Sequence, residues 1–426
     1  MSANTVPYQG PLRRSAKSLR LNFSWTMGGN LVYGITQWLI LVLLARTGRP
    51  EDVGRFSLGL AITGPLMLFA SLSLRAVQAT DTRTQYEFRD YAGLRILTTL
   101  AASLVILAIS CCFYRGESAA TIGAFGLSKA IESMSDIVYG FWQQQERMDL
   151  IAQSLMARGL TALAGAAILF HSCRSVPIAV CGIAAGWAIV LATFDIPHGI
   201  RLARKRGQRV IPRFCLPLMK QLAWLSLPLG IVTMLISLNS SIPRYLLSRM
   251  RTMHELGIFS ALGYFLLAGT LVVNALGQSA TPRLALYSSQ GRKQTFFGLS
   301  NRLLLLGLGL GVSGILVAVV AGRQVLTLLY GAEYARNSGL FVWLMIAGAF
   351  SYTASFAGYS LTAARHFRIQ LPLFSLITGL TFVLCFVMVK IEGATGVAKA
   401  LAAAGLLQTA TTIGLLHYLE AEKANT

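Results

Sequence analysis

Charged residues are scarce in this 426-residue chain: Asp, Glu, Lys and Arg together make up 12% of it, about half of their share in an average soluble domain. Apolar residues make up 54%, and the mean hydropathy is +0.60. Apolar runs of roughly 20 residues, the length that crosses a bilayer, recur along the chain, and no polar segment is long enough to form a separate soluble domain. The composition therefore predicts a multi-pass membrane protein.

Motifs for enzymatic chemistry are missing as well. The sequence has no P-loop, no HExxH and no GxSxG, so we predict neither nucleotide hydrolysis nor another enzymatic activity. The histidines are scattered near the ends of apolar runs, and the cysteines form no CxxC pair. We therefore predict no metal site and no cofactor.

Acidic residues are few compared with basic ones, 16 against 37, which gives a net charge of +21. No aromatic residues are interleaved with the basic ones, and no nucleic-acid-binding motif accompanies them. We therefore predict no nucleic-acid partner. In membrane proteins, Lys and Arg collect in the connections that stay in the cytoplasm, and this bias accounts for most of the charge.

Twelve apolar segments predict an all-α polytopic protein with about 12 transmembrane helices. They cover roughly residues 24–45, 54–75, 92–113, 119–142, 150–171, 176–198, 218–241, 256–279, 298–320, 338–362, 367–389 and 395–418. If both termini are cytoplasmic, the cytoplasmic connections carry 22 Lys and Arg and the opposite connections carry 11. This excess predicts that orientation.

One stretch occurs twice. Leu43–Ser57 reads LLARTGRPEDVGRFS, and Leu246–Ser260 reads LLSRMRTMHELGIFS, without a gap at an offset of 203 residues. Six predicted spans separate the copies, so both would form the external turn between the first two spans of a half, with Gly54 and Gly257 allowing tight packing. The repeat predicts two parallel six-helix bundles around a central cavity: an N-terminal bundle in residues 1–200, a basic cytoplasmic linker in 201–216 and a C-terminal bundle in 217–426.

The fourth predicted span carries the densest set of polar residues. Its members Lys129, Glu132, Ser133, Asp136, Gly140 and Gln143 follow helical spacing and share one face. Charged groups at bilayer depth face a bundle interior or a wet cavity. We take Lys129, Glu132 and Asp136 as candidates for lining a transport cavity and Glu132 as the candidate proton carrier. The alternative is an ion-paired helix face that only fixes packing.

Two arginines lie inside neighbouring spans. Arg158 lies about two turns into the fifth span, and its guanidinium suits phosphate oxygens; it is a candidate to line the cavity, with structural anchoring as the alternative. Arg95 lies just inside the third span. We expect its side chain to extend to the cytoplasmic headgroups.

Four amide side chains complete the candidate set: Asn30 and Gln37 in the first span, Asn239 in the seventh and Asn274 in the eighth. Amides inside a membrane commonly form hydrogen bonds between helices. They also suit sugar hydroxyl groups, so each is a candidate for the transport cavity.

Several soft motifs together resemble a known family. They are NLVYGITQW (30–38), LLAR…DVGRFSLGLAITGP (43–65), LRAVQATD (74–81), SDIVYGFWQQQERMD (135–149), SLMARG (154–159) and ELGIFSALGYFLLAG (255–269). With these segments the chain resembles the Wzx-like polysaccharide transporter branch of the multidrug/oligosaccharidyl-lipid/polysaccharide (MOP) exporter superfamily.

The resemblance implies a MATE-like fold and a flippase that moves undecaprenyl-pyrophosphate-linked oligosaccharide from the inner to the outer leaflet of a bacterial inner membrane. It also implies alternating access coupled to protons or sodium ions, contact with membrane lipids, and work alongside a polysaccharide polymerase or other assembly proteins. The product would be O-antigen, exopolysaccharide or another surface polysaccharide, including the glycan of lipopolysaccharide. The alternatives are a MATE-like drug or cation antiporter and a non-transporting membrane subunit of a glycan-assembly complex.

Overall fold

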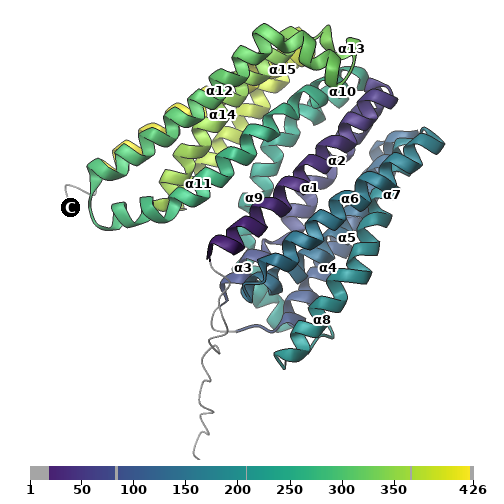
Figure 1. The fold of residues 1–426 in the computed structure, drawn as a ribbon, viewed down its shortest axis with the longest axis vertical. Coiled ribbons are helices and arrows are strands. Elements are labelled where there is room, and N and C mark those ends of the chain that lie inside the picture. Colours follow the sequence, from purple (N-terminus) through teal and green to yellow (C-terminus); the bar gives the residue numbers. More distant parts are fainter. Residues whose placement is uncertain (1–18, 82–84, 208, 365–366, 423–426) are drawn as a thin grey trace, which may run out of the picture.

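The computed structural model describes residues 19–81, 85–207, 209–364 and 367–422, and this part of the chain is helical throughout, without strands (Figure 1). The basic residues Arg13, Arg14 and Lys17, which contribute to the predicted cytoplasmic charge, lie outside the described residues, as do the two termini. The prediction of an all-α architecture is confirmed.

The helices of the first half are α1 (Leu19–Thr47), α2 (Pro50–Ser71), α3 (Leu74–Thr80), α4 (Phe88–Phe113), α5 (Gly116–Gln144), α6 (Met148–Cys173), α7 (Val176–Val190), the π-helical turn η1 (Leu191–Asp195) and α8 (Ile196–Lys205). Those of the second half are α9 (Leu216–Met250), α10 (Met253–Gly263), α11 (Phe265–Ser289), α12 (Lys293–Leu329), α13 (Ala332–Ala335), α14 (Ser338–Ala363) and α15 (Phe367–Glu422).

Ten segments of the described chain are long and apolar enough to cross a membrane. The predicted twelve spans are recovered because α5 is long enough but too polar to count among the ten, and because α15 consists of two helices joined at a kink. At the kink Gly393 has φ 58°, a backbone conformation that glycine adopts at little cost. Each predicted span therefore corresponds to a helix or a helical segment of the structure.

Short-range signals explain the turn between α1 and α2. Pro50 occupies the first turn of α2, where a missing N–H is tolerated. The Asp52 carboxylate accepts a hydrogen bond from the backbone N–H of Arg49 at 2.9 Å, at the positive end of the helix dipole. In the second copy the capping differs: Thr252 Oγ1 accepts the hydrogen bond from the backbone N–H of Glu255 at 3.2 Å.

The two halves meet at the end of the molecule where α1 ends and α10 begins, at the upper right of Figure 1. Trp38 Nε1 of α1 donates to the Tyr330 hydroxyl at 3.0 Å, and the Arg46 guanidinium donates to the carbonyl groups of Leu328 and Leu329 at the end of α12. The beginning of α2 packs against the beginning of α10. Both copies of the repeated stretch therefore lie at this junction.

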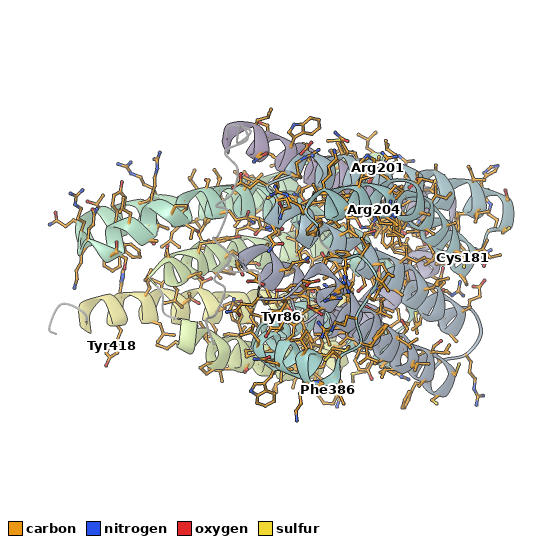
Figure 2. The ribbon with its side chains drawn as sticks, turned by 90° about the horizontal axis from the view of Figure 1, so that it is seen from below. Tyr86, Cys181, Arg201, Arg204, Phe386 and Tyr418 are labelled. Atoms are coloured by element: carbon orange, nitrogen blue, oxygen red, sulfur yellow. The ribbon has the colours of Figure 1, made fainter. Side chains whose placement is uncertain are left out.

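Helix α9 joins the halves by packing against both. Its first turns contribute Met219 and Leu222 to a buried apolar cluster with α4 and α5, and farther along the helix contacts α2 and α15. Helix α8 precedes it and carries the start of the basic linker, with Arg201 and Arg204 exposed on its surface (Figure 2).

Candidate functional site

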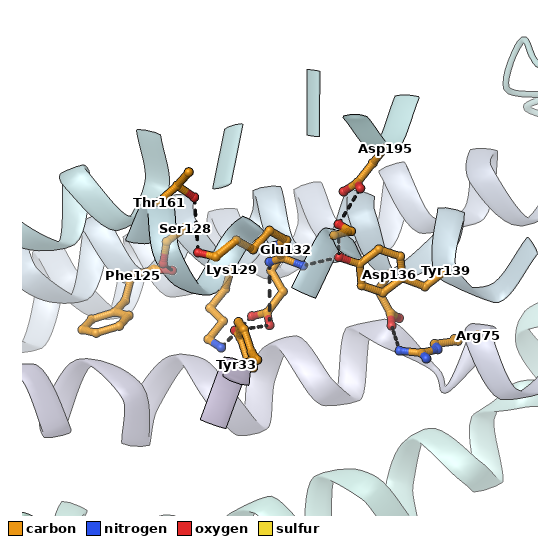
Figure 3. A network of polar contacts seen from close by, with 12 residues as sticks. Tyr33, Arg75, Phe125, Ser128, Lys129, Glu132, Asp136, Tyr139, Thr161 and Asp195 are labelled. Carbon is orange, nitrogen blue, oxygen red and sulfur yellow. Dashed lines mark hydrogen bonds and ion pairs between the residues drawn. The ribbon is translucent and has the colours of Figure 1, made fainter. Parts of the chain in front are cut away.

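The polar face of α5 is occupied by ion pairs within the helix and to neighbouring helices (Figure 3). Lys129 Nζ lies 2.6 Å from Glu132 Oε2. One turn farther, Asp136 accepts from Arg95 of α4 at 2.8 Å and from Arg75 of α3 at 3.4 Å. Lys129, Glu132 and Asp136 are 22, 29 and 30% exposed in their side chains. These three predicted residues thus form one charged strip, the α5 strip, which is partly exposed.

The expectation that Arg95 extends to the headgroups is wrong. Its side chain is 1% exposed and is held by the Asp136 carboxylate. The Asp136 carboxylate compensates the charge of the buried guanidinium, so the side chain does not need to reach the headgroups. The partner lies 41 residues away on another helix, so the position of Arg95 near the start of its span does not reveal the pairing.

Glu132 lies where α1, α5 and α6 meet. Besides Lys129, it faces Arg158 Nη2 at 3.9 Å, and the Tyr33 hydroxyl donates to its Oε1 at 3.4 Å. Tyr33 stands on the same face of α1 as Asn30 and Gln37, because these positions follow helical spacing. The polar faces of α1 and α5 therefore meet at Glu132.

Arg158 lies behind this strip rather than on it. Its side chain is 2% exposed, and the guanidinium carbon lies 4.7 Å from the centre of the Trp187 ring of α7. Nη1 donates to the Tyr139 hydroxyl at 3.4 Å. A guanidinium stacked on indole and enclosed by three helices acts on a ligand through its charge rather than by direct contact.

The four amide candidates are dispersed. Asn30 is exposed and donates to the Thr26 carbonyl of its own helix at 2.8 Å. Asn274 accepts from the Tyr359 hydroxyl at 3.1 Å and so joins α11 to α14. Gln37 Nε2 and Asn239 Oδ1 are buried without a hydrogen-bond partner in the described part of the chain. Asn30 and Gln37 thus share the face of α1 from which Tyr33 contacts Glu132, whereas Asn239 and Asn274 belong to the other half.

Three charged residues of the described helices were not among the residues predicted from the sequence. Arg75 ion-pairs with Asp136, and its Nε donates to Gln143 Oε1 at 3.0 Å. Asp195 is fully buried in η1. Arg244 lies in α9, although the predicted end of the seventh span at residue 241 leaves it in the external connection. The signal in the sequence that could have revealed them is an acidic or basic residue in a helix that continues beyond its apolar segment.

Arg244 differs from the buried residues Arg95 and Arg158 in having no acidic partner in the described part of the chain. It is half-buried, and no carboxylate of the described chain lies within ion-pair distance of it. The titratable group beside it is the Tyr264 hydroxyl at the junction of α10 and α11. A half-buried cation without a counter-ion is costly at membrane depth, so a bound anion would stabilise it.

The charges of the α5 region also do not balance. Four basic side chains, those of Arg75, Arg95, Lys129 and Arg158, are grouped with three carboxyl groups, those of Glu132, Asp136 and Asp195. Even with all three carboxyl groups ionised, one positive charge remains. The α5 region of the first half and Arg244 of the second half therefore each carry one uncompensated positive charge.

Known proteins share both the sequence features and the fold. The family model described as "Polysaccharide biosynthesis protein" matches residues 19–288. A capsular polysaccharide biosynthesis protein, CapF of Staphylococcus aureus, is 26% identical over 349 residues, which cover 82% of this chain and 87% of the relative.

Two solved structures are similar over almost the whole chain. An inward-facing multidrug-resistance MATE transporter of the MOP superfamily aligns with a TM-score of 0.74 at 12% identity, covering 94% of this chain and 96% of that one. The lipid II flippase MurJ in an inward closed conformation aligns with a TM-score of 0.73 at 13% identity, covering 93% and 87%. This likeness establishes a MATE- and MurJ-like fold. Since the family model covers more than half of the sequence, the chain belongs to the polysaccharide biosynthesis protein family.

Proposed function

We propose that this protein is a flippase that moves a polyprenyl-pyrophosphate-linked oligosaccharide from the inner to the outer leaflet of a bacterial inner membrane, for the synthesis of a surface polysaccharide. Membership in the polysaccharide biosynthesis family and the name of the CapF relative support a glycan as part of the substrate. The lipid II substrate in the name of the MurJ neighbour supports a lipid carrier by analogy of fold alone.

The observation that carries the proposal is the uncompensated charge of Arg244. A pyrophosphate crossing the bilayer brings negative charge into a region of low dielectric constant, where it needs cationic partners. Arg244 has no carboxylate partner among the described residues, and its Tyr264 neighbour can donate a hydrogen bond. A site with these groups suits phosphate oxygens.

The charge excess of the α5 region adds a second set of cationic groups on the other half. Lys129 and Arg75, with side chains 22 and 36% exposed, are the accessible members. In this proposal the strip of Lys129, Glu132 and Asp136 and the amides Asn30, Gln37, Asn239 and Asn274 contact the headgroup and the sugars. Arg158 adds positive charge from behind.

A drug or cation antiporter on the same fold would need a predominantly acidic site, because its substrates are positively charged. The excess of basic groups in both halves disfavours that alternative. A non-transporting glycan-assembly subunit has no evident use for charged residues inside its spans, which are costly to insert.

The proposed arrangement in the membrane follows from the charges and the repeat. We propose an N-terminal bundle of residues 1–200, a cytoplasmic linker of 201–216 and a C-terminal bundle of 217–426, with both termini in the cytoplasm. The exposed basic groups of α8 would then lie beside anionic headgroups. The junction of the halves at the two repeated stretches would lie on the external side, and alternating access would open it.

The function is tested by deleting the gene and analysing lipid-linked intermediates and surface glycan. We expect loss of the polymer and accumulation of lipid-linked repeat units inside the cell, both reversed by the wild-type gene. Normal polymer display without accumulation would contradict the proposal. Unchanged glycan together with altered drug susceptibility would instead support the antiporter.

A further inference from the structure

A carboxyl group outside the α5 strip lies in the interior of the first half. Asp195 is 0% exposed and ends the π-helical turn η1 between α7 and α8. Single π-helical turns inside α-helices are rare and frequently occur at functional sites, since they shift a side chain from its regular position. Here the turn places a carboxyl group among α5, α6 and α8.

The two oxygens of this carboxyl group have different surroundings. Oδ1 accepts from the Ser154 hydroxyl of α6 at 2.6 Å, whereas Oδ2 is buried without a hydrogen-bond partner in the described part of the chain. The Ser135 hydroxyl of α5 faces Asp195 but makes no hydrogen bond of good geometry. Oδ2 is therefore a free position for a proton.

A chain of hydrogen bonds that ends in an ion pair links Asp195 to the α5 strip (Figure 3). The Ser154 hydroxyl lies 2.6 Å from the Tyr139 hydroxyl, and Tyr139 accepts from Arg158 Nη1 at 3.4 Å. Arg158 Nη2 in turn faces Glu132 at 3.9 Å. Since Arg158 can only donate, Tyr139 donates to Ser154 and Ser154 to Asp195.

The charged and titratable groups that face Asp195 come from three helices: Arg158 of α6, Tyr139 of α5 and His198 of α8. No Lys or Arg of the described chain lies within ion-pair distance of it, whereas Glu132 has Lys129 at 2.6 Å. A buried carboxylate without an ion-paired cation accepts a proton more readily than one that is paired. Asp195 is therefore more ready to accept a proton than Glu132 is.

We infer that Asp195, rather than Glu132, is the carboxyl group of the first half that binds and releases a proton during transport. The proton adds to Oδ2 from water and leaves the same way, so no other reactant is needed. Protonation removes one negative charge, and the excess positive charge around α5 rises from one to two. By linkage, an anion near α5 and a proton on Asp195 then favour each other's binding.

This inference rests on the proposed function for its role in transport, but proton binding itself can be measured separately. The protein, reconstituted in vesicles, is titrated with acid while the infrared absorption of protonated carboxyl groups is recorded. We expect a carboxyl band that appears on acidification, disappears in Asp195→Asn and remains in Glu132→Gln. A band that persists in Asp195→Asn, or the absence of such a band in the wild type, would overturn the inference.

A second variant guards against misfolding of Asp195→Asn. Ser154→Ala removes the donor to Oδ1 but keeps the carboxyl group, so we expect the band to shift without being lost. An unshifted band would show that the titrating group is not Asp195.

The role in transport needs a separate measurement in cells. Folded Asp195→Asn protein, confirmed by its thermal transition in detergent, should fail to restore surface glycan to a deletion strain. Full restoration by Asp195→Asn would contradict the transport role even if the infrared result held. Failure of the wild-type gene to affect any glycan would instead contradict the proposed function and leave the proton site standing.

Discussion

Gly54 and Gly257, which are 203 residues apart and occupy the same position in the two repeated stretches, lie against each other where α2 and α10 begin. A Cβ atom at Gly54 would clash with the carbonyl oxygen of Met253, and one at Gly257 would clash with that of Pro50. Pro50 and Met253 are also equivalent positions of the repeat. Equivalent positions of the two copies therefore face each other across this junction.

Replacing Gly257 with Ala should separate the two helices, because the neighbouring backbone cannot move aside as a side chain could. Overpacking of this kind costs about 1–3 kcal/mol, so we expect a lower thermal transition of the purified protein. Gly309→Ala on α12 is the matched control, since a Cβ there meets open space. Equal transition temperatures for the two variants would argue against a tight contact.

A neighbouring pair of side chains also joins equivalent positions of the two copies. His254 Nδ1 lies 3.2 Å from Glu51 Oε1, again across 203 residues, and Nε2 lies 3.7 Å from Glu333. All three side chains are more than a third exposed. Exposed pairs contribute about 0–1 kcal/mol, so His254→Gln should change stability less than Gly257→Ala does. If chemical denaturation showed a larger loss of stability for His254→Gln than for Gly257→Ala, this pair and not the glycine contact would be the main stabilising contact of the junction.

Asp136 should be important for stability because it holds Arg95. Asp136→Asn leaves a fully buried guanidinium without a counter-ion, and we expect a loss of about 3 kcal/mol, the lower end for buried pairs, since Asp136 is partly exposed. Glu117→Gln breaks the exposed pair with Arg55, measured at 2.7 Å, and should cost less than about 1 kcal/mol. Adding Arg95→Met to Asp136→Asn should restore most of the loss. A double variant no more stable than the single one would contradict this pairing.

Arg244 should matter for transport more than for folding. Hydrogen bonds to charged groups contribute about 1.5–3 kcal/mol, so Arg244→Ala should lower glycan export in a complemented deletion strain by roughly 10- to 150-fold. The control is Arg323→Ala, which removes an exposed arginine of α12. We expect Arg244→Lys to restore export in part, because it keeps the charge but loses the planar donor pair. Normal export by a folded Arg244→Ala protein would remove the main support for an anionic substrate.

Much of the fold could be predicted from the sequence, because apolar length and charge scarcity are local properties. The twelve spans follow from apolar length and the shared face of Lys129, Glu132 and Asp136 follows from helical periodicity, and the structure confirms both. The partners of these residues could not be predicted. Arg95 and Asp136 meet across 41 residues, and helical periodicity carries no information about which neighbouring helix a face meets.

Arg244 and Asp195 were missed in the sequence for a common physical reason. Arg244 was assigned to a connection because apolarity declines before α9 ends, whereas the helix continues to Met250. Asp195 lies near the predicted end of its span at residue 198, where an acidic residue is expected to reach water. The π-helical turn, which packs against α5 and α8, buries it instead. Hydropathy alone does not locate such turns.

The most direct measurement of the central claim is a flipping assay with the purified protein in vesicles that contain a labelled polyprenyl-pyrophosphate oligosaccharide. A membrane-impermeant reagent that cleaves the glycan reports the fraction exposed on the outside. We predict that vesicles with the wild-type protein expose nearly all of the labelled lipid over time, whereas empty vesicles and vesicles with Arg244→Ala protein stay near the initial fraction. The same slow exposure with and without the wild-type protein, under proton and sodium gradients of either direction, would contradict the account.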